Sequence, residues 1–126
     1  MVLDGIEAFY VPFNTFQVSM VEAAFIDELD LAKVQMGMPM FKALARGYLE
    51  AAGSFLTKEE RALIAFSGKL ITFTIGIRFL TDFLSGDTYF RVHRPHHNLD
   101  RCRTQFKLVE SIEKQEKAMQ KFADSL

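Results

Sequence analysis

Apolar residues recur at helical spacing in three stretches of the chain, of which residues 38–52 are the first. Its apolar positions follow one another every three or four residues: Phe41, Leu44, Ala45, Tyr48 and Leu49. Pro39 falls in the first turn, where its missing N–H has no acceptor within the helix, and Gly53 follows as a C-cap. The pattern predicts a helix over residues 38–52.

The second stretch begins with a capping box and predicts the longest helix, over residues 58–84. Thr57 stands three residues before Glu60, so each side chain can cap the backbone N–H of the other. The turn Ser85-Gly86-Asp87 ends the helix. A strand over residues 70–77 is the alternative, because isoleucines alternate there with threonines and glycine, but the cap and the length favour a helix.

Two apolar faces run along this predicted helix. The first face consists of Leu63, Phe66, Leu70, Phe73, Ile77, Leu80 and Leu84. The second consists of Ile64, Ile71, Ile75, Phe79 and Phe83. Apolar side chains on most sides predict a helix that neighbouring elements enclose.

The third stretch predicts a helix over residues 98–122. A short extended piece at 88–92 and a loop at 93–97 precede it, since Pro95 disfavours helix at the residue before it. Asn98 is a good N-cap, and Asp100 suits the positive end of the helix. Residues 1–26 are predicted as an irregular segment of uncertain origin, with a helix over 15–26 as one interpretation. Residues 27–126 form the helical domain, and the fold class is all-α, with about three long helices plus short N-terminal elements.

Composition and charge narrow the class of protein. The chain has 126 residues, of which 49% are hydrophobic, and its net charge is -1. This is a single-domain composition, and it gives no general electrostatic reason to bind nucleic acid or an anionic membrane. One cysteine, Cys102, forms no internal disulfide, which favours the cytoplasm. Lys69, Arg78 and Asp82 interrupt the most apolar stretch, so no membrane span is expected.

Arg78 is the residue that the hydrophobic pattern does not explain. A guanidinium on an enclosed helix must be paired, and Asp82 lies one turn later at a spacing that allows an ion pair. Two interpretations stay open: a structural bridge between Arg78 and Asp82, or an arginine that lines a polar pocket and donates to a ligand's oxygens.

The loop before the last helix holds all three histidines of the chain. The neighbours His96 and His97 lack the spacing that places two imidazoles on one helix face, so no metal site is predicted. Cys102 has no histidine at a recognisable spacing and is predicted to be an unreactive thiol.

Several blocks of residues occur in the order found in a known family. These are GYLE at 47–50, RFLTDFL at 78–84, GDTYF at 86–90, HNLDR at 97–101 and TQFKLV at 104–109. Together they resemble the C-terminal part of the N-acetylhexosamine kinases, which belong to the aminoglycoside phosphotransferase and choline kinase superfamily and have relatives described as mucin-desulfatase-like. The resemblance spans residues 27–122.

The resemblance implies a fold and a set of site residues. The chain would be the helical C-terminal subdomain of a protein-kinase-like fold. By position, Arg78 and Tyr89 correspond to sugar-binding residues. The supporting residues would be Asp82, His97, Asn98, Asp100 and Arg101. ATP and Mg²⁺ are implied only for a complete family member, which phosphorylates the anomeric hydroxyl of an N-acetylated hexosamine.

The motifs of phosphoryl transfer have no counterpart in this chain. It contains no phosphate-covering glycine loop, no catalytic aspartate followed by asparagine, and no Asp-Phe-Gly. The chain alone is therefore predicted to be inactive and without cofactors: a substrate-side fragment, or a truncated or rearranged product, with an amino sugar as its ligand. A stand-alone helical interaction or oligomerisation module without a ligand site is the alternative. An apolar face left uncovered by a missing N-terminal lobe predicts self-association, as a homodimer.

Overall fold

The computed structural model describes residues 28–126, and this part of the chain contains helices and no strand. A 3₁₀ turn, η1 (Leu31–Lys33), precedes four helices: α2 (Met38–Ala52), α3 (Lys58–Ala62), α4 (Ile64–Leu84) and α5 (His97–Asp124). The all-α prediction is confirmed for these residues, and α2 has the predicted bounds. The irregular segment and the helix predicted within residues 1–26 lie outside the described residues.

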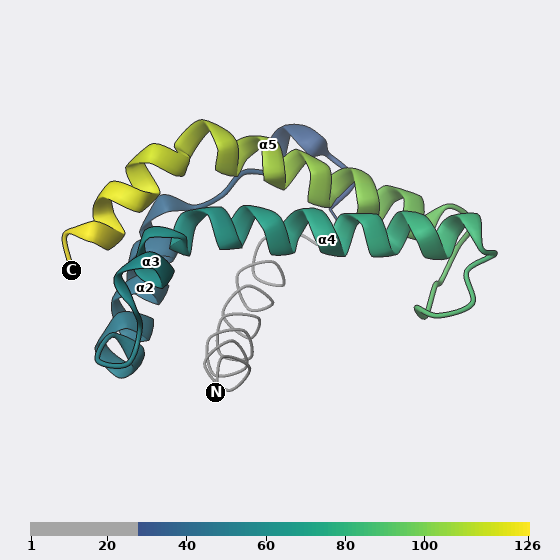
Figure 1. Cartoon of the computed structure of the whole chain (residues 1–126). Coiled ribbons are helices and arrows are strands. Elements are labelled where there is room, and N and C mark those ends of the chain that lie inside the picture. Colours follow the sequence, from purple (N-terminus) through teal and green to yellow (C-terminus); the bar gives the residue numbers. More distant parts are fainter. Residues whose placement is uncertain (1–27) are drawn as a thin grey trace.

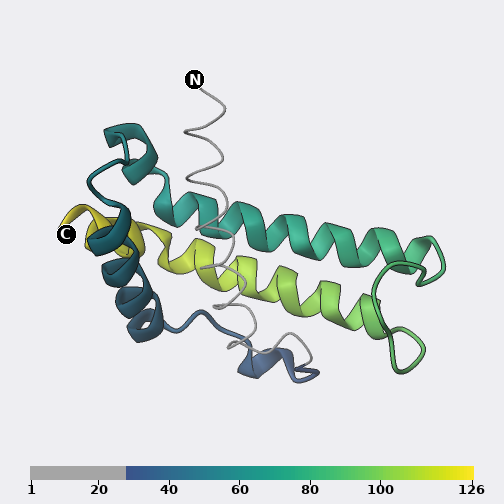
Figure 2. The ribbon, with the colours of Figure 1, turned by 90° about the horizontal axis from the view of Figure 1, so that it is seen from below.

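Two long antiparallel helices, α4 and α5, form the body of the molecule. They lie side by side in both views, and the loop of residues 85–96 joins them at one end (Figures 1 and 2). The rings of Phe73 and Phe106 stack across the pair with centroids 5.6 Å apart. Gly76 permits this close approach, because a Cβ there would lie 2.7 Å from the Phe106 ring. Lys69 of α4 and Glu116 of α5 form an ion pair at 2.8 Å.

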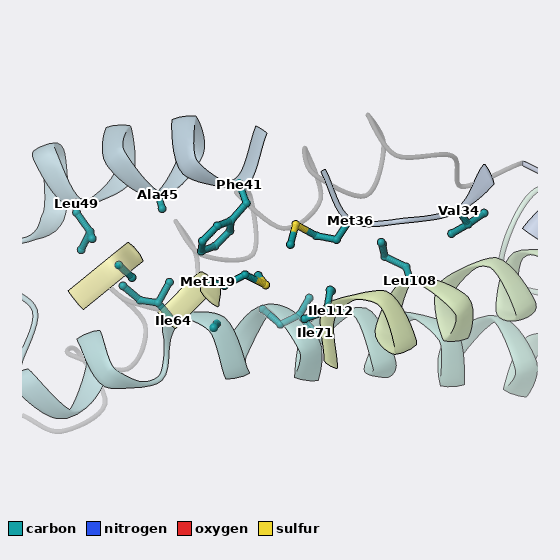
Figure 3. Close-up of a cluster of buried hydrophobic side chains, with 12 residues drawn as sticks. Val34, Met36, Phe41, Ala45, Leu49, Ile64, Ile71, Leu108, Ile112 and Met119 are labelled. Atoms are coloured by element: carbon teal, nitrogen blue, oxygen red, sulfur yellow. The ribbon is translucent and has the colours of Figure 1, made fainter. Parts of the chain in front are cut away.

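The hydrophobic core lies at the opposite end, where α2 packs against α4 and α5. Figure 3 shows the side chains of α2 pointing toward those of the other two helices. The buried cluster includes Val34, Met36, Phe41, Ala45, Leu49, Ile64, Ile71, Leu108, Ile112 and Met119. The backbone of Met36 is tied to α5: its N–H donates to Ser111 Oγ at 2.9 Å, and its carbonyl accepts from Gln115 Nε2 at 3.0 Å.

The helix predicted over residues 58–84 is interrupted at Leu63, which separates α3 from α4. The capping box at its start is confirmed, with Thr57 Oγ1 accepting from Glu60 N–H at 3.1 Å. At the break, the Ala65 N–H donates to Gln120 Oε1 at 3.1 Å. Gln120 Nε2 in turn donates to the Arg61 carbonyl at 2.9 Å. The glutamine of α5 thus replaces the helical hydrogen bond from residue 65 to residue 61.

The prediction that neighbouring elements enclose α4 is wrong for the part of the chain that the structure describes. One face is buried, including Ile64, Ala65, Ile71 and Phe79. The first predicted face is largely exposed, from Leu63 to Leu84. The cause is the architecture: α5 covers one side of α4, and α2 covers only the end of the pair. By length and composition α4 is also apolar enough to cross a membrane, with a mean hydropathy of 1.3.

Candidate functional site

Asp82, in the last turn of α4, organises the loop that joins α4 to α5. Its Oδ1 accepts from the N–H groups of Thr88 at 2.9 Å and Tyr89 at 2.8 Å. Its Oδ2 accepts from the Phe90 N–H at 3.0 Å and from Asn98 Nδ2 at 2.7 Å. The side chain is buried. One carboxylate therefore fixes three consecutive loop residues and the start of α5.

The hydrogen bonds at Asp82 also set its charge state. Burial acts to raise the pKa of this carboxyl, because it disfavours the charged form. The hydrogen bonds from Phe90, Tyr89, Thr88 and Asn98 favour the charged form and outweigh burial, so the pKa lies below its ordinary value. Asp82 is therefore an ionised anchor, unsuited to accept a proton from a substrate near neutral pH.

A tight turn brings the loop back over the end of α4. The helix ends as predicted at Ser85, whose N–H donates to the Thr81 carbonyl at 3.0 Å. Gly86 and Asp87 then take positive φ values of 93° and 59°, which glycine and aspartate adopt more readily than most residues. Asp87 Oδ1 accepts from Asn98 Nδ2 at 3.0 Å, so the turn is also tied to α5.

Asn98 is not the N-cap of α5, contrary to prediction. The helix begins at His97, and His96 precedes it with a φ of 64° and without a side-chain cap. The carboxamide of Asn98 points instead to Asp82 and Asp87. The amide nitrogen of Asn98 thus donates to two carboxylates, of which the Asp82 contact is buried, and the side chain does not cap the helix.

Arg78 lies over the aromatic residues of the loop rather than beside Asp82. Its guanidinium carbon is 5.6 Å from the Tyr89 ring centroid and 5.7 Å from that of Phe90. The two rings meet edge to face at 4.9 Å. The bridge to Asp82, one of the two interpretations from the sequence, is absent among the described residues, since the carboxylate accepts from backbone donors. Arg78 is exposed, so the paired charge expected on an enclosed helix is not required.

A pocket of about 310 Å³ opens at this corner of the molecule. Its lining consists of Arg78, Thr81, Asp82, Ser85, Thr88, Tyr89 and Phe90. It therefore combines a guanidinium, an aromatic wall and the hydroxyl groups of Thr81, Ser85, Thr88 and Tyr89. The loop and the last turns of α4 bring together Arg78, Asp82 and Tyr89, three residues named from the sequence.

The remaining residues named from the sequence lie outside the pocket lining and hold the loop to α5. Arg101 donates to the Arg91 carbonyl at 3.0 Å and to Asn98 Oδ1 at 3.2 Å. Asp100 forms an ion pair with Arg94. His97 Nδ1 accepts from a loop N–H at 3.2 Å. These contacts position the loop without facing a ligand.

Four residues of the lining were not named from the sequence: Thr81, Ser85, Thr88 and Phe90. Thr81 and Ser85 could have been found, because they lie three and seven residues after Arg78 and so share its helix face. Thr88 and Phe90 line the pocket only because of the path that the loop takes, and no local sequence pattern predicts that path.

Neither a metal site nor a reactive thiol is found in residues 28–126. No group of three or more metal-ligating side chains comes together there. Burial raises the pKa of the Cys102 thiol, and the nearby Arg103 only partly opposes this, so the thiol stays protonated near neutral pH.

No protein-family model matches the chain.

Proposed function

We propose that this chain is the substrate-side helical part of an N-acetylhexosamine kinase-like protein and that it binds an amino sugar in the Arg78 pocket. The observation that carries the proposal is the position of the Arg78 guanidinium over the Tyr89 ring at the pocket wall. These are the two residues that the family resemblance marks as sugar-binding.

The chemistry of the lining suits an N-acetylated sugar. The apolar face of a pyranose ring packs on aromatic side chains, and Tyr89 is 74% exposed and accessible for such stacking. The guanidinium donates to hydroxyl or acetamido oxygens, and Thr81, Ser85 and Thr88 offer hydroxyl groups that both donate and accept. The pocket volume of about 310 Å³ lies at the small end of ligand sites, which span roughly 300–1,000 Å³.

The proposal gives this chain no phosphoryl transfer of its own. Transfer depends on positioned nucleotide, metal and a base near the acceptor hydroxyl. The Asp82 carboxylate is taken up by backbone donors, and its lowered pKa makes it a poor base. ATP and Mg²⁺ belong to a complete family member, and Asp82 holds the aromatic wall in place.

Titration calorimetry with N-acetylglucosamine and N-acetylgalactosamine tests the proposal. We expect millimolar binding of at least one sugar and a loss of about ten-fold or more for Arg78→Ala, since a hydrogen bond to a charged group contributes about 1.5–3 kcal/mol. Arg91→Ala is the matched control, because Arg91 is exposed in the same loop but outside the lining. Binding that survives in Arg78→Ala, or no heat with either sugar, would reject the sugar site.

A second candidate function is a helical interaction module without a ligand site. The exposed apolar face of α4 favours it. Failure of both sugars to bind, together with self-association, would select this candidate.

A further inference from the structure

A stripe of exposed apolar side chains runs along α4, on the face turned away from the core. We call this the outer stripe, and its members are Leu63, Phe66, Leu70, Phe73, Ile77 and Leu84, which are between 39% and 74% exposed. Monomeric soluble proteins rarely leave a contiguous apolar surface of this length uncovered. Within residues 28–126, α5 and α2 cover mainly other sides of α4, although Phe73 at the edge of the stripe also stacks on Phe106 of α5.

The spacing of the outer stripe is that of a helix–helix interface. Its members, together with the half-buried Leu80, follow one another at intervals of three and four residues in strict alternation. Within α4, from Phe66 to Leu84, this is a seven-residue repeat, the pattern in which side chains of one helix fit between those of another, and Leu63 continues it to the residue before the helix. One flank of the stripe carries Ser67, Thr74 and Thr81, and these small side chains allow a second helix to come close.

The area of the outer stripe is sufficient for a specific dimer. The exposed fractions of its six members add up to about three whole side chains. At roughly 200 Å² for an aromatic side chain, and less for leucine and isoleucine, this is at most about 600 Å² on one copy and about 1,200 Å² in a pair. Specific protein interfaces begin at about this size.

Charge favours a protein surface over a lipid surface as the cover of the outer stripe. The Lys69–Glu116 ion pair lies between α4 and α5, and its side chains are still about a quarter exposed. The adjoining helix α5 carries a network of exposed charges, including Lys107, Glu110 and Lys114. Bringing α4 into a bilayer would desolvate part of these groups, whereas a partner helix needs to cover only the stripe.

We infer that the outer stripe of α4 is the interface with a second copy of this chain. The same stripe on both copies forms a two-fold symmetric contact, in which the exposed leucine and phenylalanine side chains of one α4 pack between those of the other. Thr81, on the flank of the outer stripe, also lines the Arg78 pocket, so the interface borders the pocket there, whereas Tyr89 and Phe90 lie on the 85–96 loop.

Light scattering on the full chain at micromolar concentration tests the inference. Wild type is expected at twice the mass of one chain. Leu70→Glu places a charge at the middle of the stripe, where Leu70 is 50% exposed, and is expected to raise the dissociation constant more than ten-fold and give a monomer. Phe55→Glu is the matched control, because Phe55 is 57% exposed outside the stripe and this variant should remain a dimer.

Folding and lipid binding are measured on the same samples. A far-UV circular dichroism spectrum equal to that of wild type shows that Leu70→Glu is folded, and Ile77→Glu serves as the second variant if it is not. A monomeric wild type, or dimers in both folded charge variants, overturns the inference. So does a wild type that binds vesicles of phosphatidylcholine and phosphatidylglycerol in place of dimerising.

The inference does not rest on sugar binding. Leu70 lies two turns before Arg78, so Leu70→Glu should leave any sugar affinity unchanged while it removes the dimer. Loss of sugar binding in Arg78→Ala with the dimer intact would complete the separation of the two sites.

Discussion

At the residue scale, the conformation of the pocket depends on a single carboxylate. Asp82 accepts from three consecutive backbone N–H groups, which form a concave anion-binding arrangement, and from Asn98 at the start of α5. These hydrogen bonds also fix the positions of the Tyr89 and Phe90 rings, because the backbone N–H groups of both residues are among the donors. Arg78 then rests on rings whose position Asp82 has set.

The lowered pKa of Asp82 predicts how stability depends on pH. Because the pKa of this carboxyl is lower in the folded chain, its ionised form contributes stability that is complete above the unfolded-state pKa of about 3.9. That contribution is lost as the pH falls below this value and through the lower folded-state pKa. Urea denaturation of wild type and Asp82→Asn from neutral to acid pH should show a difference between them that shrinks with acidification.

The control for this measurement is Glu113→Gln, an acid on the exposed side of α5. Its difference from wild type should stay small at every pH. A constant difference between wild type and Asp82→Asn across the acid range would contradict the assigned role of Asp82.

At the scale of the helical elements, one side chain determines how α3 and α4 join. Gln120 donates to the Arg61 carbonyl and accepts from the Ala65 N–H, and Ala65 is only 1% exposed. Water therefore has little access to the Ala65 N–H if the glutamine is removed. The break at Leu63 is stable because α5 supplies the missing partner groups.

Replacing Gln120 by methionine keeps the length of the side chain and removes both hydrogen bonds. We expect a loss of about 1–3 kcal/mol in the free energy of unfolding, since a buried N–H is left without a partner. Lys117→Met is the control on the same helix, because Lys117 is exposed. Equal unfolding midpoints for Gln120→Met and this control in thermal and urea denaturation would show that the bridge is unimportant.

The limits of prediction from this sequence follow from the same contacts. Pro39, the Thr57–Glu60 box and the Ser85-Gly86-Asp87 turn are local signals, and each marks an element boundary that the structure confirms. The break at Leu63 was not predictable, because the group that stabilises it lies 55 residues away from Ala65 in the chain. Periodicity likewise located both apolar faces of α4 but could not tell which one a neighbour covers.

The candidate site was likewise predictable from local signals and not from long-range contacts. Arg78 stood out because it is a charge in an apolar run, and this drew attention to the correct end of α4. Of the two interpretations of Arg78, the bridge to Asp82 is wrong, because helical spacing brings the two residues near one another and says nothing about competing donors. The loop's backbone N–H groups occupy the carboxylate, and only the path of residues 85–90 reveals them.

At the scale of the whole molecule, the core and the pocket lie at opposite ends of the α4–α5 pair. α2 packs at one end, whereas the 85–96 loop forms the other (Figure 1). The long contact between α4 and α5 is the connection between the two ends. Changes in the core should therefore alter the amount of folded protein without changing the pocket in the molecules that remain folded.

Phe41→Ala tests how the core end and the pocket end of the molecule are connected. Phe41 is 1% exposed and is the aromatic side chain with which α2 enters the core, so its truncation should cost about 3–5 kcal/mol in the free energy of unfolding. This is a large part of the free energy of unfolding of a typical domain, roughly 5–15 kcal/mol. The unfolding of α2 and of the α4–α5 pair should nevertheless remain one cooperative transition. Met40→Ala, at an exposed neighbouring position, should cost far less. Urea denaturation followed by circular dichroism measures both values. Tyrosine fluorescence in a Tyr10→Phe/Tyr48→Phe background, which leaves Tyr89 as the only tyrosine, reports the pocket end. If the two signals separate in Phe41→Ala, with the pocket end unfolding independently, the α4–α5 contact does not couple the two ends of the molecule.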